Sequence, residues 1–286
     1  MKEKNRYRYI KLLVMFLIIS MYSLSTTAVS SASALSSALS NASENLIVLT
    51  ANISLSANLT IAERTGGNLT IDGNGYTVSM GGSNLNLDNG LNDQNLTLKN
   101  FKATGNNFII YENTTLNKWN IFLDGTNDIT TSFEVMFRSD DSTSNFTALP
   151  GSNNTLTGTG GKTPFGLIES YGNVTNDNSH TTINTVKGSA FYYRDLWLNS
   201  RNRTINVING GTLDIIGHSA IYAPDYHYGT SDDSNINVNV VGSGSKLTAN
   251  TKEITFNSGS GSYRSDINLL AKDGGTITAS TNVNGK

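Results

Sequence analysis

One pattern recurs three times in the last third of this 286-residue sequence. Each copy has an Ile-Asn start, an alternating run, a glycine-containing corner and a second alternating run, and the copies begin at Ile205, Ile236 and Ile267. The starts are 31 residues apart in both intervals. A unit of two or three short strands cannot bury its apolar face alone, whereas stacked units line a shared interior. The repeat therefore predicts a β-solenoid in which the three isoleucines lie one above another and Ile236 points into the interior.

A second register supports the same arrangement. Residues 188–192 resemble residues 218–222, and their Ser-Ala pairs are 30 residues apart. Earlier in the chain, short runs alternate apolar and small polar residues, which is the period of a β-strand. These runs are residues 53–55, 59–61, 69–71, 76–78, 85–87 and 96–98.

Two other folds built from many short strands fit this pattern less well. The strands of a β-sandwich are usually longer and less similar to one another. A propeller repeat of roughly 40–50 residues carries four strands, often with aromatic or Trp-Asp signatures that this sequence lacks. We therefore predict an all-β parallel β-helix over residues 46–286.

Asparagine is the most unusual feature of the composition, with 38 positions, while charged residues make up only 15%. The low charge and the many Ile, Val, Leu and Tyr residues argue against disorder, and so much Asn, Thr, Ser and Gly argues against a helical protein. In a β-helix, asparagines at repeated positions would form amide ladders, and others would occupy left-handed corners. The absence of cysteine excludes a disulfide framework, a thiolate zinc site and a cysteine nucleophile.

Residues 1–34 resemble a secretory signal peptide. A basic segment precedes the apolar run 12–19, and a small-residue stretch ends in Ala32-Ser33-Ala34, which predicts cleavage after Ala34. The alternative is an uncleaved anchor, but eight apolar residues are short against the roughly 20 that span a bilayer. The mature chain contains no comparable run and is expected to lack a membrane span. Residues 35–45 are predicted to form a leader or a short helix that closes one end of the β-helix.

The charge of the mature chain argues against nucleic acid as a partner. Removing residues 1–34 takes away five basic residues and one acid, which leaves a net charge of about −6 without basic clusters. An exported, acidic, cysteine-free chain with a basic leader is typical of a Gram-positive bacterium. We therefore expect a secreted or cell-surface location.

Residues 69–78 and 95–101 resemble the first coils of pectate-lyase-like right-handed β-helices. They are most similar to the pectate-lyase-like adhesive domains of Gram-positive surface proteins, and the resemblance spans about residues 45–286. It implies a right-handed parallel β-helix and an adhesive role. Many members end in a sortase signal or a WxL cell-wall-binding domain, whereas residues 282–286 show neither an LPxTG-like signal nor a hydrophobic tail. The sequence leaves open the attachment mechanism, the oligomeric state and whether the chain is a fragment.

A polysaccharide lyase or glycoside hydrolase acting on acidic polysaccharide is the alternative function. Lyases on this scaffold combine carboxylates that hold Ca²⁺ with an Arg or Lys base, and hydrolases need two positioned carboxyl groups. No candidate lies in a recognisable catalytic motif, so we predict neither catalytic residues nor a bound metal, and Ca²⁺ has no specific support. The candidate acids are Asp140, Asp141, Asp177, Asp232 and Asp233, and the candidate bases are Arg138, Arg194, Arg203 and Arg264.

Two aromatic excursions from the strand pattern, residues 191–197 and 220–233, are the candidate ligand-binding segments. They are about one repeat apart, so we expect them to lie side by side if the register holds. Their rings could stack on sugars, and their carboxylates could accept hydrogen bonds from hydroxyls. The structural interpretation is that these aromatic residues pack on one another at the edge of a coil. The candidate binding residues are Tyr192, Tyr193 and Trp197 in the first excursion, and Tyr222, Asp225, Tyr226, Tyr228, Asp232 and Asp233 in the second.

These observations favour a non-catalytic, exported adhesin or cell-envelope interaction module. Its expected partner is a glycan, a host or matrix component, or a component of the cell envelope. A carbohydrate-active enzyme differs in requiring convergent acids and a base in one groove, whereas a binding module needs only exposed aromatic and polar surface.

Overall fold

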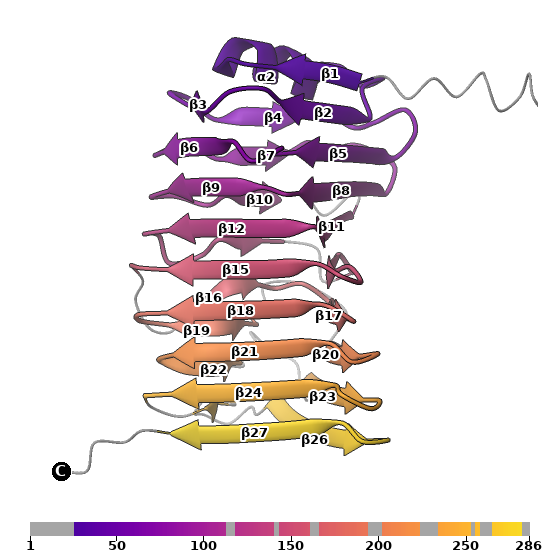
Figure 1. The fold of residues 1–286 in the computed structure, drawn as a ribbon, viewed down its shortest axis with the longest axis vertical. Helices are drawn as coiled ribbons and strands as arrows, with labels where there is room; N and C mark the ends of the chain where they lie inside the picture. Colours follow the sequence, from indigo (N-terminus) through magenta and orange to yellow (C-terminus); the bar gives the residue numbers. More distant parts are fainter. Residues whose placement is uncertain are drawn as a thin grey trace, which may run out of the picture.

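The computed structural model describes residues 26–112, 118–139, 143–160, 166–193, 202–223, 234–252, 255–257 and 265–281. These residues form an all-β parallel β-helix whose turns stack along the long axis of the molecule (Figure 1). The predicted fold class is confirmed. Within the described part of the chain, the strands lie in three sheets, which we call A, B and C.

Sheet A has ten strands in the described residues. They are β1 (Thr26–Val29), β2 (Leu46–Leu49), β5 (Asn68–Asp72), β8 (Gln94–Lys99), β11 (Trp119–Asp124), β14 (Asn145–Ala148), β17 (Asn173–Asp177), β20 (Asn202–Ile208), β23 (Ser234–Val241) and β26 (Ser265–Lys272).

Sheet B has nine strands in the described residues. They are β3 (Ile53–Ser54), β6 (Thr77–Gly81), β9 (Lys102–Gly105), β12 (Thr126–Thr131), β15 (Asn153–Gly158), β18 (His180–Thr185), β21 (Thr212–Gly217), β24 (Lys246–Thr251) and β27 (Thr276–Thr281).

Sheet C has eight strands in the described residues. They are β4 (Leu59–Ile61), β7 (Leu85–Leu87), β10 (Ile110–Glu112), β13 (Phe137–Arg138), β16 (Gly166–Glu169), β19 (Ser189–Tyr192), β22 (Ser219–Tyr222) and β25 (Phe256–Asn257).

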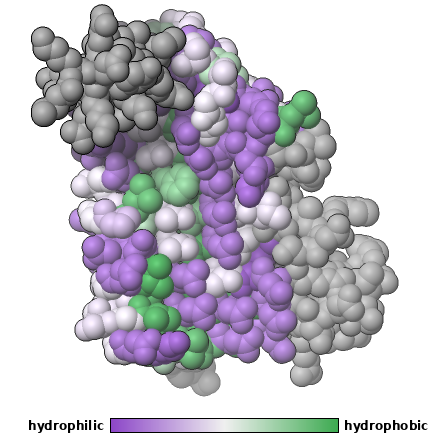
Figure 2. Space-filling view, turned by 90° about the vertical axis from the view of Figure 1, so that its right-hand side faces the viewer, coloured by the Kyte–Doolittle hydropathy of each residue, from purple (hydrophilic) through white to green (hydrophobic). Residues whose placement is uncertain are grey.

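The core is the interior of this stack, and period-2 alternation decides which side chains enter it. In β11, Trp119, Ile121 and Leu123 are fully buried, while the residues between them point outward and are only partly buried. Ile236 is 1% exposed, so its predicted inward orientation is confirmed. The face seen in Figure 2 carries a continuous hydrophilic band with a few hydrophobic patches, as expected for the outer side of such a coil.

The stacking of the repeat is confirmed for two of its three starts and wrong for the first. Ile236 pairs with Ile267, but Ile205 pairs with Val238, two residues further along β23. A shift of two residues keeps every side chain on the same face of the strand, so the hydrophobic pattern does not distinguish the two registers. The second predicted register is confirmed, because Ser189 pairs with Ser219 and their hydroxyl oxygens are 2.8 Å apart.

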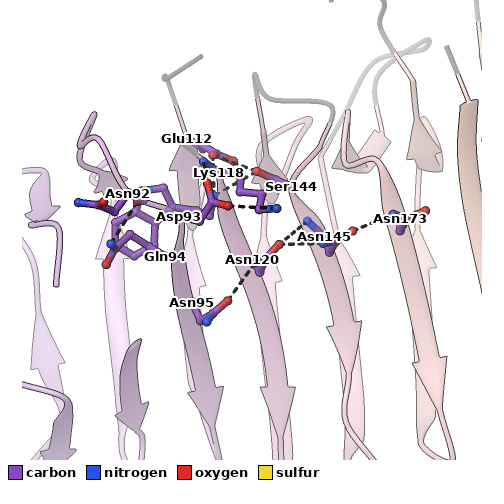
Figure 3. Close-up of polar contacts among 11 residues, drawn as sticks. Asn92, Asp93, Gln94, Asn95, Glu112, Lys118, Asn120, Ser144, Asn145 and Asn173 are labelled. Carbon is purple, nitrogen blue, oxygen red and sulfur yellow. Dashed lines mark hydrogen bonds and ion pairs between the residues drawn. The ribbon is translucent and has the colours of Figure 1, made fainter. Parts of the chain in front are cut away.

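The predicted amide ladder is present on the outer face of sheet A. In each case the Nδ2 of one asparagine donates to the Oδ1 of the asparagine one turn earlier, at 2.9 Å. Figure 3 shows the ladder running across neighbouring strands. Its members are Asn68, Asn95, Asn120, Asn145 and Asn173. Asparagine also occupies corners with positive φ, as predicted, at positions 74, 100, 178 and 209.

The N-terminal end of the β-helix is capped by β1 and by helix α2 (Ala32–Ser40). The Arg64 guanidinium reaches the last turn of α2, where Nη2 donates to the Leu39 carbonyl at 2.6 Å and Nη1 donates to the Asn41 carbonyl. Burial lowers the pKa of Arg64 to about 10, against the opposing effect of Glu44. The predicted leader at 35–45 overlaps α2, but the predicted cleavage point after Ala34 falls inside this helix.

Candidate functional site

A single column of side chains runs along sheet C and joins the two aromatic excursions. Backbone pairing places its members directly beside one another on successive turns, in the order Tyr111, Arg138, Glu169, Tyr192 and Tyr222. The preceding residue in β13, β19 and β22 is a buried Phe or Ile of the core, so alternation directs the column away from the interior. We call these five residues the sheet C column.

The first half of the column combines aromatic and charged groups. The Arg138 Cζ lies 5.4 Å from the centroid of the Tyr111 ring, which is cation–π geometry. Its Nε lies 3.6 Å from Oε1 of Glu169, and the Glu169 side chain is only 2% exposed. Phe108 stacks on Tyr111 with ring centroids 4.8 Å apart. These contacts hold Arg138 between a ring and a carboxylate, so it is not placed as a free catalytic base.

The second half of the column is a tyrosine pair. The rings of Tyr192 and Tyr222 are 5.8 Å apart and inclined by 16°, so they stack. The two aromatic excursions therefore lie side by side at this point, as predicted from their spacing. Tyr192 is 2% exposed and Tyr222 is partly buried. Packing between the rings accounts for part of this burial, and a role in ligand binding stays a prediction.

Tyr193 follows the column and turns into the core. It is 4% exposed, and among the described residues its hydroxyl has no hydrogen-bond partner. Burial raises its pKa, and the charge of Arg203 opposes that rise. Its backbone N–H donates to the Tyr222 carbonyl at 3.1 Å, which ties the ends of the two strands together.

The remaining predicted binding residues lie outside the described residues. They are Trp197, Asp225, Tyr226, Tyr228, Asp232 and Asp233. Trp197 belongs to segment 194–201, which begins directly after Tyr193, and the other five belong to segment 224–233, which begins directly after Ala223. Each segment therefore begins two residues after a tyrosine of the sheet C column, Tyr192 or Tyr222. Segments 113–117 and 140–142 also lie outside the described residues, and they follow β10 and β13 of the same sheet.

The candidate catalytic residues that the structure describes do not converge. Arg203 is 2% exposed and pairs with Ile236 in sheet A, whereas Asp177 accepts from Asn209 Nδ2 at 2.8 Å on the outer face. Asp140, Asp141, Arg194, Asp232, Asp233 and Arg264 lie outside the described residues. Within the described ranges, no group of three or more His, Cys, Asp or Glu residues is placed to hold a metal ion.

A buried carboxylate was missed by sequence reasoning. Glu112 is fully buried, and its Oε1 accepts hydrogen bonds from the Trp119 N–H at 3.0 Å and from the Ser144 hydroxyl at 3.1 Å (Figure 3). It pairs with Leu87, which marks it as an inward position of β10. Burial raises the pKa of Tyr171, and the Glu112 charge adds to that rise. An acid in phase with Ile110 was the signal that could have found it.

A groove at the end of sheet B was also missed. It has a volume of about 460 Å³ and crosses four turns at the ends of β15, β18, β21 and β24. Val186 and Ile216 are about half exposed in it, and Gly217 and Lys252 lie beside them. No aromatic cluster or acidic motif in the sequence points to this place.

The fold resembles a solved structure from Lactobacillus reuteri, titled "L. reuteri 53608 SRRP", a serine-rich repeat protein. The TM-score is 0.61 at 16% identity, covering 88% of this chain and 99% of the other. A second structure, titled "L. reuters 100-23 SRRP", has a TM-score of 0.47 at 15% identity, covering 89% of this chain and 98% of the other. The first of these structures supports the β-helix implied by the family resemblance, but it is a serine-rich repeat protein and is not specifically pectate-lyase-like.

No family model matches the sequence, and no curated protein matches it. Within the part of the chain that the structure describes, no helix has the length and apolar character needed to cross a bilayer.

Proposed function

We propose that this chain is a non-catalytic, exported surface protein that acts as an adhesin or cell-envelope interaction module. Its binding region comprises segments 194–201 and 224–233, which follow strands β19 and β22 of sheet C. The observation that carries the proposal is the stacking of Tyr192 on Tyr222, which brings the bases of these two segments together. The residues of these segments that we propose bind the ligand are Trp197, Asp225, Tyr226, Tyr228, Asp232 and Asp233.

The scaffold suits this role. Parallel strands paired on every turn form a rigid rod, and loops positioned by a rigid scaffold carry binding function disproportionately. Aromatic rings and carboxylates at one edge supply the two contacts that sugars and peptides use, namely an apolar face and hydrogen-bond acceptors. The expected ligand is a glycan, or a host, matrix or envelope component that presents one, at the surface of a Gram-positive bacterium.

Binding of the secreted protein to a glycan array and to whole cells tests this proposal. Tyr226→Ala should reduce binding several-fold, because it removes a ring from segment 224–233. The matched control is Tyr76→Ala, which truncates a tyrosine that is 36% exposed and lies between β5 and β6. Equal losses in both variants would contradict the proposed location.

The enzymatic alternative is tested on the same preparations. Incubation with uronate polymers should release neither unsaturated nor new reducing ends. Robust turnover that is lost in the Asp232→Ala, Asp233→Ala double variant would overturn the non-catalytic proposal and favour a polysaccharide lyase or hydrolase.

A further inference from the structure

We propose that the precursor is cut between Ser25 and Thr26, so that the mature protein begins with the first residue of β1. This places the processing site nine residues upstream of the predicted cut after Ala34. The argument rests on what the residues between the two sites do in the fold.

Residues 26–29 are an integral strand of sheet A. β1 pairs in parallel with β2 over four residues, from Thr26 beside Leu46 to Val29 beside Leu49. The Val29 side chain is fully buried in the core. Its carbonyl accepts from the Thr50 N–H at 2.8 Å and from the Thr50 hydroxyl at 3.1 Å. A cut after Ala34 would remove this strand and expose β2 as the edge of the sheet.

The same cut would remove the start of helix α2. Ser31 is its N-cap: the hydroxyl accepts from the Ala34 N–H at 3.2 Å, and the carbonyl accepts from the Leu35 N–H at 2.9 Å. Leu35 and Leu39 project from this helix into the core and are 2% and 0% exposed. Without its cap and first turn, six residues of α2 would remain, which is too few to form a stable helix on their own.

The sequence offers a suitable site directly upstream of β1. Ser23 and Ser25 are small residues at the third and first positions before the proposed bond, the spacing that signal peptidases require. They follow the apolar run 12–19 closely, whereas Ala34 lies fifteen residues beyond the end of that run. No charged residue lies between 26 and 34, so the mature net charge of about −6 is unchanged.

The test is to express the full precursor in a bacterium that secretes it, and to determine the N-terminus of the secreted protein by sequencing and intact mass. We expect Thr26 as the first residue. An N-terminus at Leu35 or Val29, or a secreted protein that still begins at Met1, would overturn the proposal.

Matched variants identify the peptidase site itself. Ser25→Gln places a long side chain before the proposed bond and should leave most of the chain unprocessed. Ala34→Gln makes the same change before the alternative bond and should leave processing unaltered. The opposite pattern would overturn the proposal.

A stability comparison covers the case in which the variants fold poorly. A chain that begins at Thr26 should melt at least several degrees higher than a chain that begins at Leu35. Equal melting temperatures would show that β1 and the helix start are dispensable, and the structural argument would fail.

Discussion

The two ends of the described β-helix are built from similar strands but meet their surroundings differently. At the N-terminal end, β1 and α2 cover the first turn, and Leu35, Leu39 and Ile47 are 0–2% exposed. At the other end, β26 and β27 have no further turn beside them in the described residues, and Leu269 is 48% exposed. Val238, its register partner one turn earlier, is fully buried. Burial in this fold is therefore conferred by the neighbouring turn and not by the strand itself, as expected for a solenoid.

The largest expected effect compares these two register partners. Val238→Asp would place a charge in the interior without a partner and should lower the free energy of unfolding by roughly 3 to 5 kcal/mol. Leu269→Asp makes the same change in the last described turn, where Leu269 is 48% exposed, and should stay within about 0.5 kcal/mol. Urea denaturation of both variants measures the difference. Equal costs would show that the last turn is covered and would break the comparison.

The second prediction concerns the capped end. Arg64→Met keeps the aliphatic stem but removes the charged donor to the Leu39 and Asn41 carbonyls, each of which keeps one backbone N–H donor, and this should cost about 2 kcal/mol. Under conditions in which the rest of the protein stays folded, the backbone amides of α2 should exchange hydrogen faster in this variant than in the parent.

The control for Arg64 is an exposed cation. Lys99→Met removes a 3.6 Å ion pair with Asp124 on the outer face of sheet A. Such surface pairs contribute at most about 1 kcal/mol. If the two variants lose the same stability, the guanidinium does not hold the cap.

The third prediction compares ladder positions. The Asn145 side chain donates one hydrogen bond and accepts another, both at 2.9 Å. Asn145→Ala therefore removes two hydrogen bonds between side-chain amides and should cost about 1 kcal/mol. Asn268 makes one bond, to Asn237 at 3.1 Å in the last described turn. Asn268→Ala should therefore cost about 0.3 kcal/mol. A larger loss for Asn268 in thermal melts would contradict a ladder that gains from neighbours on both sides.

The smallest effect is a pH dependence close to the capped end. Hydrogen bonds from the Asn92 side chain and the Leu91 N–H lower the pKa of Glu63 below its ordinary value of 4.5. The folded state then holds the proton less tightly than the unfolded state, so the stabilisation is present above about pH 4.5 and is lost as the pH falls through the lowered value. Melting curves from pH 6 to pH 3 should show a shallower decline for Glu63→Gln. Identical profiles would rule this contribution out.

The fold was largely predictable because stacking leaves a periodic record in the sequence. The alternation in residues 236–240 identified the inward face, and the Ser-Ala pairs at 189 and 219 identified one register correctly. The register of Ile205 was not predictable, because a two-residue shift preserves the face of every side chain. The extent of the N-terminal cap was also hidden, since Ala32-Ser33-Ala34 serves both as a peptidase-like motif and as the first turn of α2.

The site was predictable in outline only. Spacing of about one repeat correctly placed Tyr192 beside Tyr222. It did not reveal that Tyr192 is almost fully buried, because burial on the outer side of a coil depends on what packs there and not on strand period. Nor did it reveal that Tyr193, just past the end of the strand, turns into the core. Nor did the sequence suggest the Arg138–Glu169 contact, which joins residues separated by a full turn.

The asparagines on sheet A have a directional consequence. At every rung the amide hydrogen points toward the preceding turn and the amide oxygen toward the following one. The side-chain dipoles therefore add along the rod instead of cancelling, and each can polarise the next. A row of neutral groups thus gives the rod an electrical polarity, with unlike ends, that its formal charges alone do not reveal.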